Sequence, residues 1–302
     1  MMIKSVDKFI LSILMGLVFI LSGCGQKNNE ENRVETDNAP GKESTKESAI
    51  PIRNVFINVP SPIEIVQLIK KSGAKYDKSY LNSTGTVSKY TSSIDKALNL
   101  GAYGCDFCFS SVFEQTQESV LYLKCCNTLA GGLGIAGSFN NETALRVEAN
   151  RNNRDSLLKI ISDAYWNADA DLKENGRSNT ASLIVTGGWI EGLYIATKIA
   201  ETTKNDDIIS RIGEQKLSLK NLVDLVENSG KDESTANILT QLKSLQEIYN
   251  GVQITKSKVE STIDGKTRVT TVGGLLDNVS INDEQLKAIS DKILTIRNSI
   301  IQ

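Results

Sequence analysis

Two acidic residues stand inside apolar segments of the sequence, Asp106 within GAYGCDFCF and Glu191 within VTGGWIEGLYIA. If these two segments touch, the carboxyl groups would share a pocket beneath Tyr103, Trp189 and Tyr194. Such a pocket would bind a small polar or cationic ligand, or it would use the two acids as an acid/base pair.

A structural interpretation stands beside this one. A carboxyl group in apolar surroundings must accept hydrogen bonds, pair with a basic residue or keep its proton. Each acid would then accept bonds from tyrosine hydroxyls, helix N-termini or an Arg or Lys, and would determine how the helices pack. We favour this interpretation, because structural ion pairs also perturb carboxylates and because no sequence pattern shows that the two segments touch.

Four further cysteines form two pairs, Cys105-x-x-Cys108 and Cys125-Cys126. Adjacent cysteines fit a zinc site poorly, and a thioredoxin-like redox motif needs a βαβ context that the sequence lacks. We favour small buried core residues, with a disulfide between two helices second and a metal site third.

The composition excludes several classes of function. The chain has no histidine, which removes His-based triads, His metal ligands and the usual near-neutral base. A carboxylate pair or a Ser–Lys mechanism is still possible. The formal net charge is −2, with acids and bases interspersed, so we expect no nucleic-acid partner. We also expect no cofactor and no metal.

The amino terminus carries an export signal. Lys4 and Lys8 precede an apolar run, residues 9–21, that is too short to span a bilayer comfortably and suits a signal-peptide core. The run leads into Leu21-Ser22-Gly23-Cys24, which resembles the lipobox of bacterial lipoproteins. The resemblance implies that residues 1–23 are removed and that Cys24 carries acyl chains, palmitate among them, which hold the protein to a membrane.

The residues after Cys24 indicate the membrane and a tether. Gly25, in place of Asp, resembles the sorting signal of outer-membrane lipoproteins, whereas Glu30 and Glu31 only weakly resemble a cell-surface signal. Whether the domain faces the periplasm or the outside is therefore open. Residues 24–49 are polar and predict a disordered tether with an end-to-end distance on the order of 25–30 Å.

Residues 50–302 predict a single all-α domain, a bundle of about eight to ten helices. No proline follows Pro62, which favours long helices. We expect the first helix to begin at Ser61-Pro62-Ile63-Glu64 and to end near Ser72. The further predicted helices are 92–113, 116–129, 142–149, 154–174, 180–203, 206–212, 218–228, 233–251 and 283–301.

Local signals refine this prediction. Asn282 and Gln285 resemble a capping box for the last helix, and Asn175-Gly176 and Ser229-Gly230 resemble helix ends. Several glycines lie inside predicted helices, where glycine costs about 1 kcal/mol. Gly101 with Gly104, and Gly188 with Gly192, each lie on one helix face, so we expect another backbone to approach there.

One β-hairpin is predicted at about residues 257–273, around the Asp264-Gly265 turn signal. We favour a three-residue loop, because it places one mildly apolar face against the helices. The pairs that follow from this loop are Ile263 with Thr267, Ser261 with Val269 and Val259 with Thr271.

Three segments together resemble a family of uncharacterised Bacteroidetes lipoproteins: INVPSPIEIVQLIKKSGAKY, ALNLGAYGCDF and TGGWIEGLYIA. The resemblance covers most of the predicted domain. It implies an envelope location and a helical fold, and it supplies no catalytic residue.

From these observations we expect an outer-membrane-anchored, non-enzymatic helical domain that binds an envelope protein or a small ligand. The alternatives are an envelope enzyme that uses Asp106 and Glu191 as acid and base, and a purely structural envelope protein. The sequence does not identify the ligand, the partner or the oligomeric state.

Overall fold

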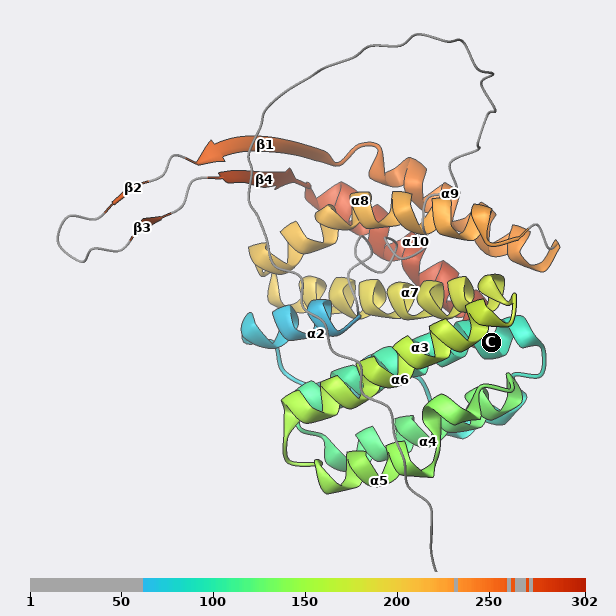
Figure 1. The fold of residues 1–302 in the computed structure, drawn as a ribbon. Helices are drawn as coiled ribbons and strands as arrows, with labels where there is room; N and C mark the ends of the chain where they lie inside the picture. The colour runs from blue at the N-terminus through green and yellow to red at the C-terminus, as the bar shows by residue number, and fades with distance from the viewer. Residues whose placement is uncertain (1–61, 231–232, 260–261, 264–269, 272–273) are drawn as a thin grey trace, which may run out of the picture. The chain divides into compact units, whose positions relative to one another are not determined.

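The computed structural model describes residues 62–230, 233–259, 262–263, 270–271 and 274–302 (Figure 1). In this part of the chain, eight α-helices are followed along the sequence by short β-strands and a last α-helix, which confirms the predicted all-α fold with one small β element. Residues 50–302 group into one compact unit. The predicted signal peptide, Cys24, the tether and the Ser61 cap lie outside the described residues.

The helices alternate with short connections. The α-helices are α2 (Pro62–Lys71), α3 (Ser93–Val112), α4 (Thr116–Gly132), α5 (Asn141–Ala149), α6 (Arg154–Glu174), α7 (Ser178–Thr203), α8 (Asp206–Asn228), α9 (Glu233–Tyr249) and α10 (Asp283–Ile301). The 3-10 helices are η2 (Lys78–Tyr80), η3 (Thr84–Lys89) and η4 (Ala136–Phe139).

Asparagine side chains begin several of these helices, because a short amide can accept a hydrogen bond from an unpaired N–H group of the first turn. Asn140, Asn153 and Asn205 do so at the starts of α5, α6 and α8. At α10 the predicted capping box is confirmed, since Asn282 and Gln285 bond each other's backbone N–H groups.

The sequence predicted two separate helices, 206–212 and 218–228, and this was wrong. The structure has one helix, α8, which continues through Gly213. A Cβ atom on Gly213 would lie 2.3 Å from Cγ1 of Val279, so this glycine admits a strand against the helix and does not end it. The propensity of glycine to stop helices is outweighed here by a tertiary contact.

The β-ribbon is longer than predicted, and the predicted partners of Val259 and Ile263 were wrong. The predicted pair of Ser261 with Val269 lies outside the described residues. β1 (Gln253–Val259) pairs antiparallel with β4 (Gly274–Ser280), so that Val259 lies opposite Gly274. β2 (Thr262–Ile263) pairs with β3 (Thr270–Thr271), so that Ile263 lies opposite Thr270. The pairing therefore begins at Gln253 opposite Ser280, which lie close to the end of α9 and the start of α10.

Helix α7 is the central element and packs against α2, α3, α6, α8 and α10. It is buried on nearly all sides, as its apolar sequence indicates. Its tightest contact is with α3. A Cβ atom on Gly101 would lie 2.0 Å from the carbonyl oxygen of Ile184, and one on Gly187 would lie 1.8 Å from that of Leu98. The two backbones therefore touch.

The other predicted glycine contacts have different partners. A Cβ atom on Gly104 would lie 1.7 Å from the phenol oxygen of Tyr165 on α6, and this phenol donates a 2.6 Å hydrogen bond to the carbonyl of Leu100. Gly192, in contrast, meets only Ile65 and Cys105 side chains at ordinary contact distances. Close backbone approach thus occurs at Gly101 and Gly187, and it includes the predicted Gly188, whose backbone nitrogen would lie 2.5 Å from a Cβ atom on Gly101.

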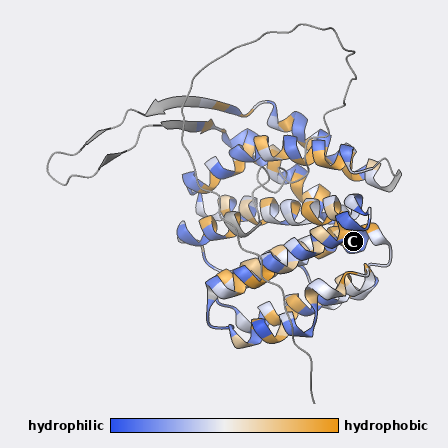
Figure 2. Ribbon diagram, in the orientation of Figure 1, coloured by the Kyte–Doolittle hydropathy of each residue, from blue (hydrophilic) through white to orange (hydrophobic). Residues whose placement is uncertain are grey.

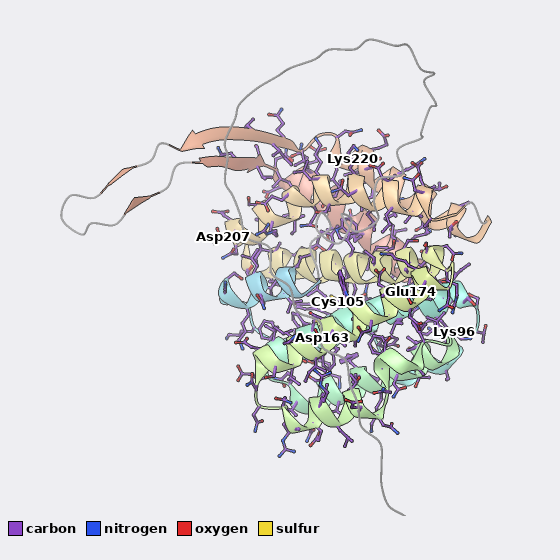
Figure 3. All side chains as sticks on the ribbon, in the orientation of Figure 1. Lys96, Cys105, Asp163, Glu174, Asp207 and Lys220 are labelled. Atoms are coloured by element: carbon purple, nitrogen blue, oxygen red, sulfur yellow. The ribbon has the colours of Figure 1, made fainter. Side chains whose placement is uncertain are left out.

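The outer helices carry both hydrophilic and hydrophobic residues, as Figure 2 shows for α6 and α8. Figure 3 places Cys105 inside the helical body, whereas Asp207 and Lys220 lie at its margin. Among the residues that the structure describes, the large apolar side chains with the greatest exposure are Leu145 at 71% and Trp166 at 58%. None of the helices described here combines the length and the apolar character needed to cross a membrane.

We expect Gly101→Ala and Gly187→Ala each to destabilise the protein by about 3 kcal/mol or more. This is the top of the range usual for overpacking, because the new methyl groups would meet backbone atoms, which cannot move aside easily. The measurement is urea unfolding followed by circular dichroism.

Gly131→Ala is the matched control. Gly131 lies in α4, and a methyl group added to it would have no other atom within 4 Å, so alanine should be neutral or should stabilise the helix by up to about 1 kcal/mol. Equal stability of all three variants would contradict the close approach of α3 and α7.

Candidate functional site

Glu191 of α7 and Arg297 of α10 form an ion pair inside the helical body. The guanidinium donates from Nε to Glu191 Oε2 at 2.8 Å and from Nη2 to Oε1 at 2.9 Å. The two side chains are 1% and 8% exposed. The guanidinium carbon also lies 4.1 Å from the ring centre of Tyr194, a cation–π contact. Both oxygens of the acid are therefore occupied by one base.

Asp106 of α3 is held by the segment that precedes α3. Its Oδ2 accepts hydrogen bonds from the backbone N–H and the side-chain amide of Asn82, at 3.1 and 2.8 Å. Asp106 is fully buried, and its Oδ1 has no hydrogen-bond partner among the described residues. The phenol of Tyr122 on α4 donates to the carbonyl of Asn82 at 2.9 Å and holds that residue in place.

Asn82 joins the two acids into one buried polar network, which consists of Glu191, Arg297, Asn82 and Asp106. Arg297 Nη2 donates to Asn82 Oδ1 at 2.9 Å, while the amide nitrogen of Asn82 donates to Asp106. The acids therefore lie near each other, but an arginine and an asparagine stand between them. Four elements of the fold meet at this network: α3, α7, α10 and the connection between η2 and η3.

The structure brings only some of the predicted pocket residues to this network. Tyr194 stacks on Arg297, as described above. Tyr103 is buried nearby and donates a 2.7 Å hydrogen bond to the carbonyl of Ser83, which follows Asn82. Trp189 lies elsewhere, because its indole N–H donates to Gln215 of α8 at 3.0 Å. Trp189 thus belongs to the α7–α8 contact.

Sequence reasoning missed Arg297, Asn82 and Tyr122. One signal was present for Arg297, which lies on the apolar stripe of α10 next to Ile293, Ile296 and Ile300, where a base requires a buried acid as partner. No comparable signal exists for Asn82, which lies in a polar connection with many similar residues.

The environment shifts the protonation of Asp106 and Arg297 in different ways. Burial, reinforced by the negative charge of Glu191, raises the pKa of Asp106 well above its usual range, against the opposing effects of Asn82 and Arg297. For Arg297, burial disfavours the charge, but the attraction and hydrogen bonds of Glu191 outweigh it, and the pKa is raised. Arg297 therefore stays charged, and Asp106 keeps its proton to higher pH than an exposed aspartate does.

The four cysteines described by the structure, Cys105, Cys108, Cys125 and Cys126, are free and buried. Burial raises the pKa of Cys108 to about 12 and that of Cys125 to about 11, so both remain unreactive thiols near neutral pH. Within the described residues, no group of three His, Cys, Asp or Glu side chains could hold a metal ion.

The geometry suits packing better than it suits chemistry. General acid–base catalysis needs a carboxyl group within hydrogen-bond reach of a substrate. Glu191 instead uses both oxygens for Arg297, and Asp106 is enclosed by α3, α4 and the segment around Asn82. Comparisons with protein-family models, with curated proteins and with solved structures each gave no match.

Replacing Arg297 by methionine should destabilise the protein by about 3–5 kcal/mol, because Glu191 would be left as an unpaired buried charge. The double variant Arg297→Met/Glu191→Leu should recover much of this loss, since it removes both charges. Chemical unfolding of the wild type, both single variants and the double variant measures the coupling.

Lys220→Met is the control, because Lys220 and Asp224 form an exposed pair on α8 with side chains 68% and 47% exposed. Its effect should stay within about 0.5 kcal/mol. A loss in Arg297→Met no larger than in this control would show that the buried pair contributes nothing to stability.

The raised pKa of Asp106 predicts a pH dependence. Above the usual aspartate range, the unfolded chain releases this proton while the folded chain keeps it, so stability falls as pH rises toward the raised pKa, by up to about 1.4 kcal/mol per pH unit. Asp106→Asn should remove this slope, because an amide oxygen can still accept both bonds from Asn82.

Urea unfolding between about pH 4 and pH 8, the range above the usual aspartate pKa, checks this. Asp163→Asn is the control, because Asp163 lies in a partly exposed pair with Lys159 on α6. Asp106→Asn should match the wild type at the acidic end and exceed it near neutral pH. Parallel stability curves for the wild type and Asp106→Asn would show that Asp106 is ionised in the folded protein.

Proposed function

We propose that this protein is a lipid-anchored helical domain of the bacterial outer membrane that acts by binding an envelope protein or a small ligand, without catalysis of its own. The sequence around Cys24 supports the anchor: a basic start, an apolar core and Leu-Ser-Gly-Cys occur in the order of a lipoprotein signal. The polar stretch of residues 25–49 supports a domain that stands away from the lipid surface.

The buried polar network is the observation that supports the non-enzymatic part. Its charged groups neutralise one another, and Arg297 and Asn82 occupy the space between the two acids that a substrate would need. The alternative of an acid/base pair at Asp106 and Glu191 therefore receives no support from the geometry. The network fixes the positions of the helices and therefore the shape of the surface that they form. A surface of fixed shape is compatible with a role in binding.

The described surface offers charged groups for association. Lysine and acid pairs at helical spacing lie on the outer faces of α6, α8 and α10, for example Lys159 with Asp163 and Lys287 with Asp291. Such exposed pairs contribute little to stability. They keep the surface soluble and mixed in charge, which suits a domain that meets its partners at a membrane surface and has no affinity for nucleic acid.

The test is native mass spectrometry of the protein extracted from its host's membranes. We expect a chain that lacks residues 1–23, carries acyl chains on Cys24 and retains a bound partner or ligand under gentle conditions. Cys24→Ala should abolish the acylation and release the protein from the membrane fraction, because the lipid is the proposed anchor.

Gln26→Ala is the matched control, since it alters the neighbouring tether and leaves the thiol intact. An unmodified Cys24 in the wild type would contradict the anchor. An acylated protein that never carries a partner or ligand would contradict the binding role and would favour a purely structural envelope protein.

A further inference from the structure

Three buried oxygen atoms lie around the connection before α3, residues 72–92, and have no hydrogen-bond partner among the described residues. They are Oδ1 of Asp106 on α3, Oε2 of Glu118 on α4 and the phenol oxygen of Tyr76 in the connection. A buried polar atom without a partner costs free energy, and in native proteins an ordered water or an ion commonly supplies the missing bond.

The connection before α3 lies against both helices that carry the acids. The ring of Tyr76 stacks on Phe109 of α3, with the ring centres 5.6 Å apart, and Phe109 follows Asp106 by almost one helical turn. Lys78, two residues after Tyr76, donates to Oε1 of Glu118 on α4 at 2.7 Å. The three oxygens therefore belong to one junction, where the connection, α3 and α4 meet.

The electrostatic effects of these groups on one another also indicate that they are neighbours. Burial raises the pKa of the Tyr76 phenol, and the charges of Glu118 and Asp106 add to this rise. Burial likewise raises the pKa of Tyr122 on α4, and the same three groups add to it. The hydroxyl of Ser110 acts in the opposite direction on Tyr76, but it donates its own hydrogen bond to the backbone carbonyl of Asp106 at 2.8 Å.

The hydrogen-bonding chemistry of the three groups suits water. Both donors of Asn82 bond Oδ2 of Asp106, so a proton on this carboxyl group belongs on Oδ1 and needs an acceptor. The phenol of Tyr76 is a second donor, and Oε2 of Glu118 is an acceptor. A single water molecule can accept from both donors and donate to the carboxylate.

A cation suits the charges of this junction less well. The charge of Glu118 is met by Lys78, and that of Glu191 is met by Arg297. Asp106 keeps its proton to higher pH than an exposed aspartate does. Little negative charge is therefore left for a cation to balance, and a cation cannot accept the hydrogen bonds that a protonated carboxyl group and a phenol offer.

We propose that Asp106, Glu118 and Tyr76 form a binding site for an ordered water molecule, which is held between Oδ1, Oε2 and the phenol oxygen. The water continues the buried polar network beyond Asp106 to Glu118, whose other oxygen pairs with the largely exposed Lys78. It thereby joins the connection before α3 to both α3 and α4.

Crystal structures of the whole chain and its variants test this site. In the wild type we expect a water within about 3.2 Å of Asp106 Oδ1 and of at least one of the other two oxygens. Tyr76→Phe/Glu118→Met should lose this water, because only one polar partner would remain and a buried water needs at least two. Lys78→Met is the matched control and should keep the water, since it breaks the surface pair and leaves all three oxygens in place.

Soaking wild-type crystals in rubidium chloride distinguishes water from a monovalent cation, because rubidium scatters X-rays far more strongly than water. An unchanged peak supports the water site. A stronger peak at this position overturns the proposal, and so does a wild-type structure in which the three groups bond one another directly with no water between them.

A double-mutant cycle in solution applies even if the double variant does not crystallise. Tyr76→Phe and Glu118→Met should each lower the midpoint of urea unfolding, and together they should lower it by less than the sum, because both groups bind the same water. Tyr80→Phe is the control, since Tyr80 lies in the same connection and its phenol is not one of the buried oxygens without a partner. Shifts of the midpoint that simply add would overturn the proposal.

Discussion

The rest of the structure depends on one requirement, that the carboxylate of Glu191 in the middle of α7 meets a positive charge inside the core. Arg297 of α10 meets it with two parallel hydrogen bonds, which fix both the distance and the orientation of the two side chains. Replacing such a pair by apolar residues is often neutral for stability. Its main effect is therefore to specify how the C-terminal helix docks, including its rotation and its register along α7.

The second constraint is the contact between α3 and α7, where glycines remove the side chains that would keep the backbones apart. Close approach brings Asp106 and Glu191 into one electrostatic neighbourhood, so that the charge of Glu191 adds to burial in raising the pKa of Asp106. The two constraints are linked: the tight crossing creates a buried acid pair, and Arg297 with Asn82 makes that pair tolerable. Asn82 holds Asp106 there with two N–H groups that both donate to Oδ2.

The buried polar groups serve the fold, whereas the proposed binding role belongs to the surface of the protein. The acids, phenols and thiols that would suggest chemistry in the sequence are used inside the fold as hydrogen-bond partners and small packing groups. The network ties together residues from the beginning, the middle and the end of the described chain. A domain held in this way presents a constant surface, which is a useful property for a protein that we propose to bind partners at a membrane.

The sequence by itself determined the features that depend on neighbouring residues. The α-helices apart from α8, the Asn282–Gln285 capping box and the buried character of α7 were predicted, because propensity, capping and hydrophobic periodicity act within a few turns. Only the tertiary structure decided the partner of Glu191, the direction of Trp189, the continuity of α8 through Gly213 and the register of the ribbon. Each of these depends on a contact between segments that lie far apart along the chain, and no local pattern encodes which distant residue will arrive.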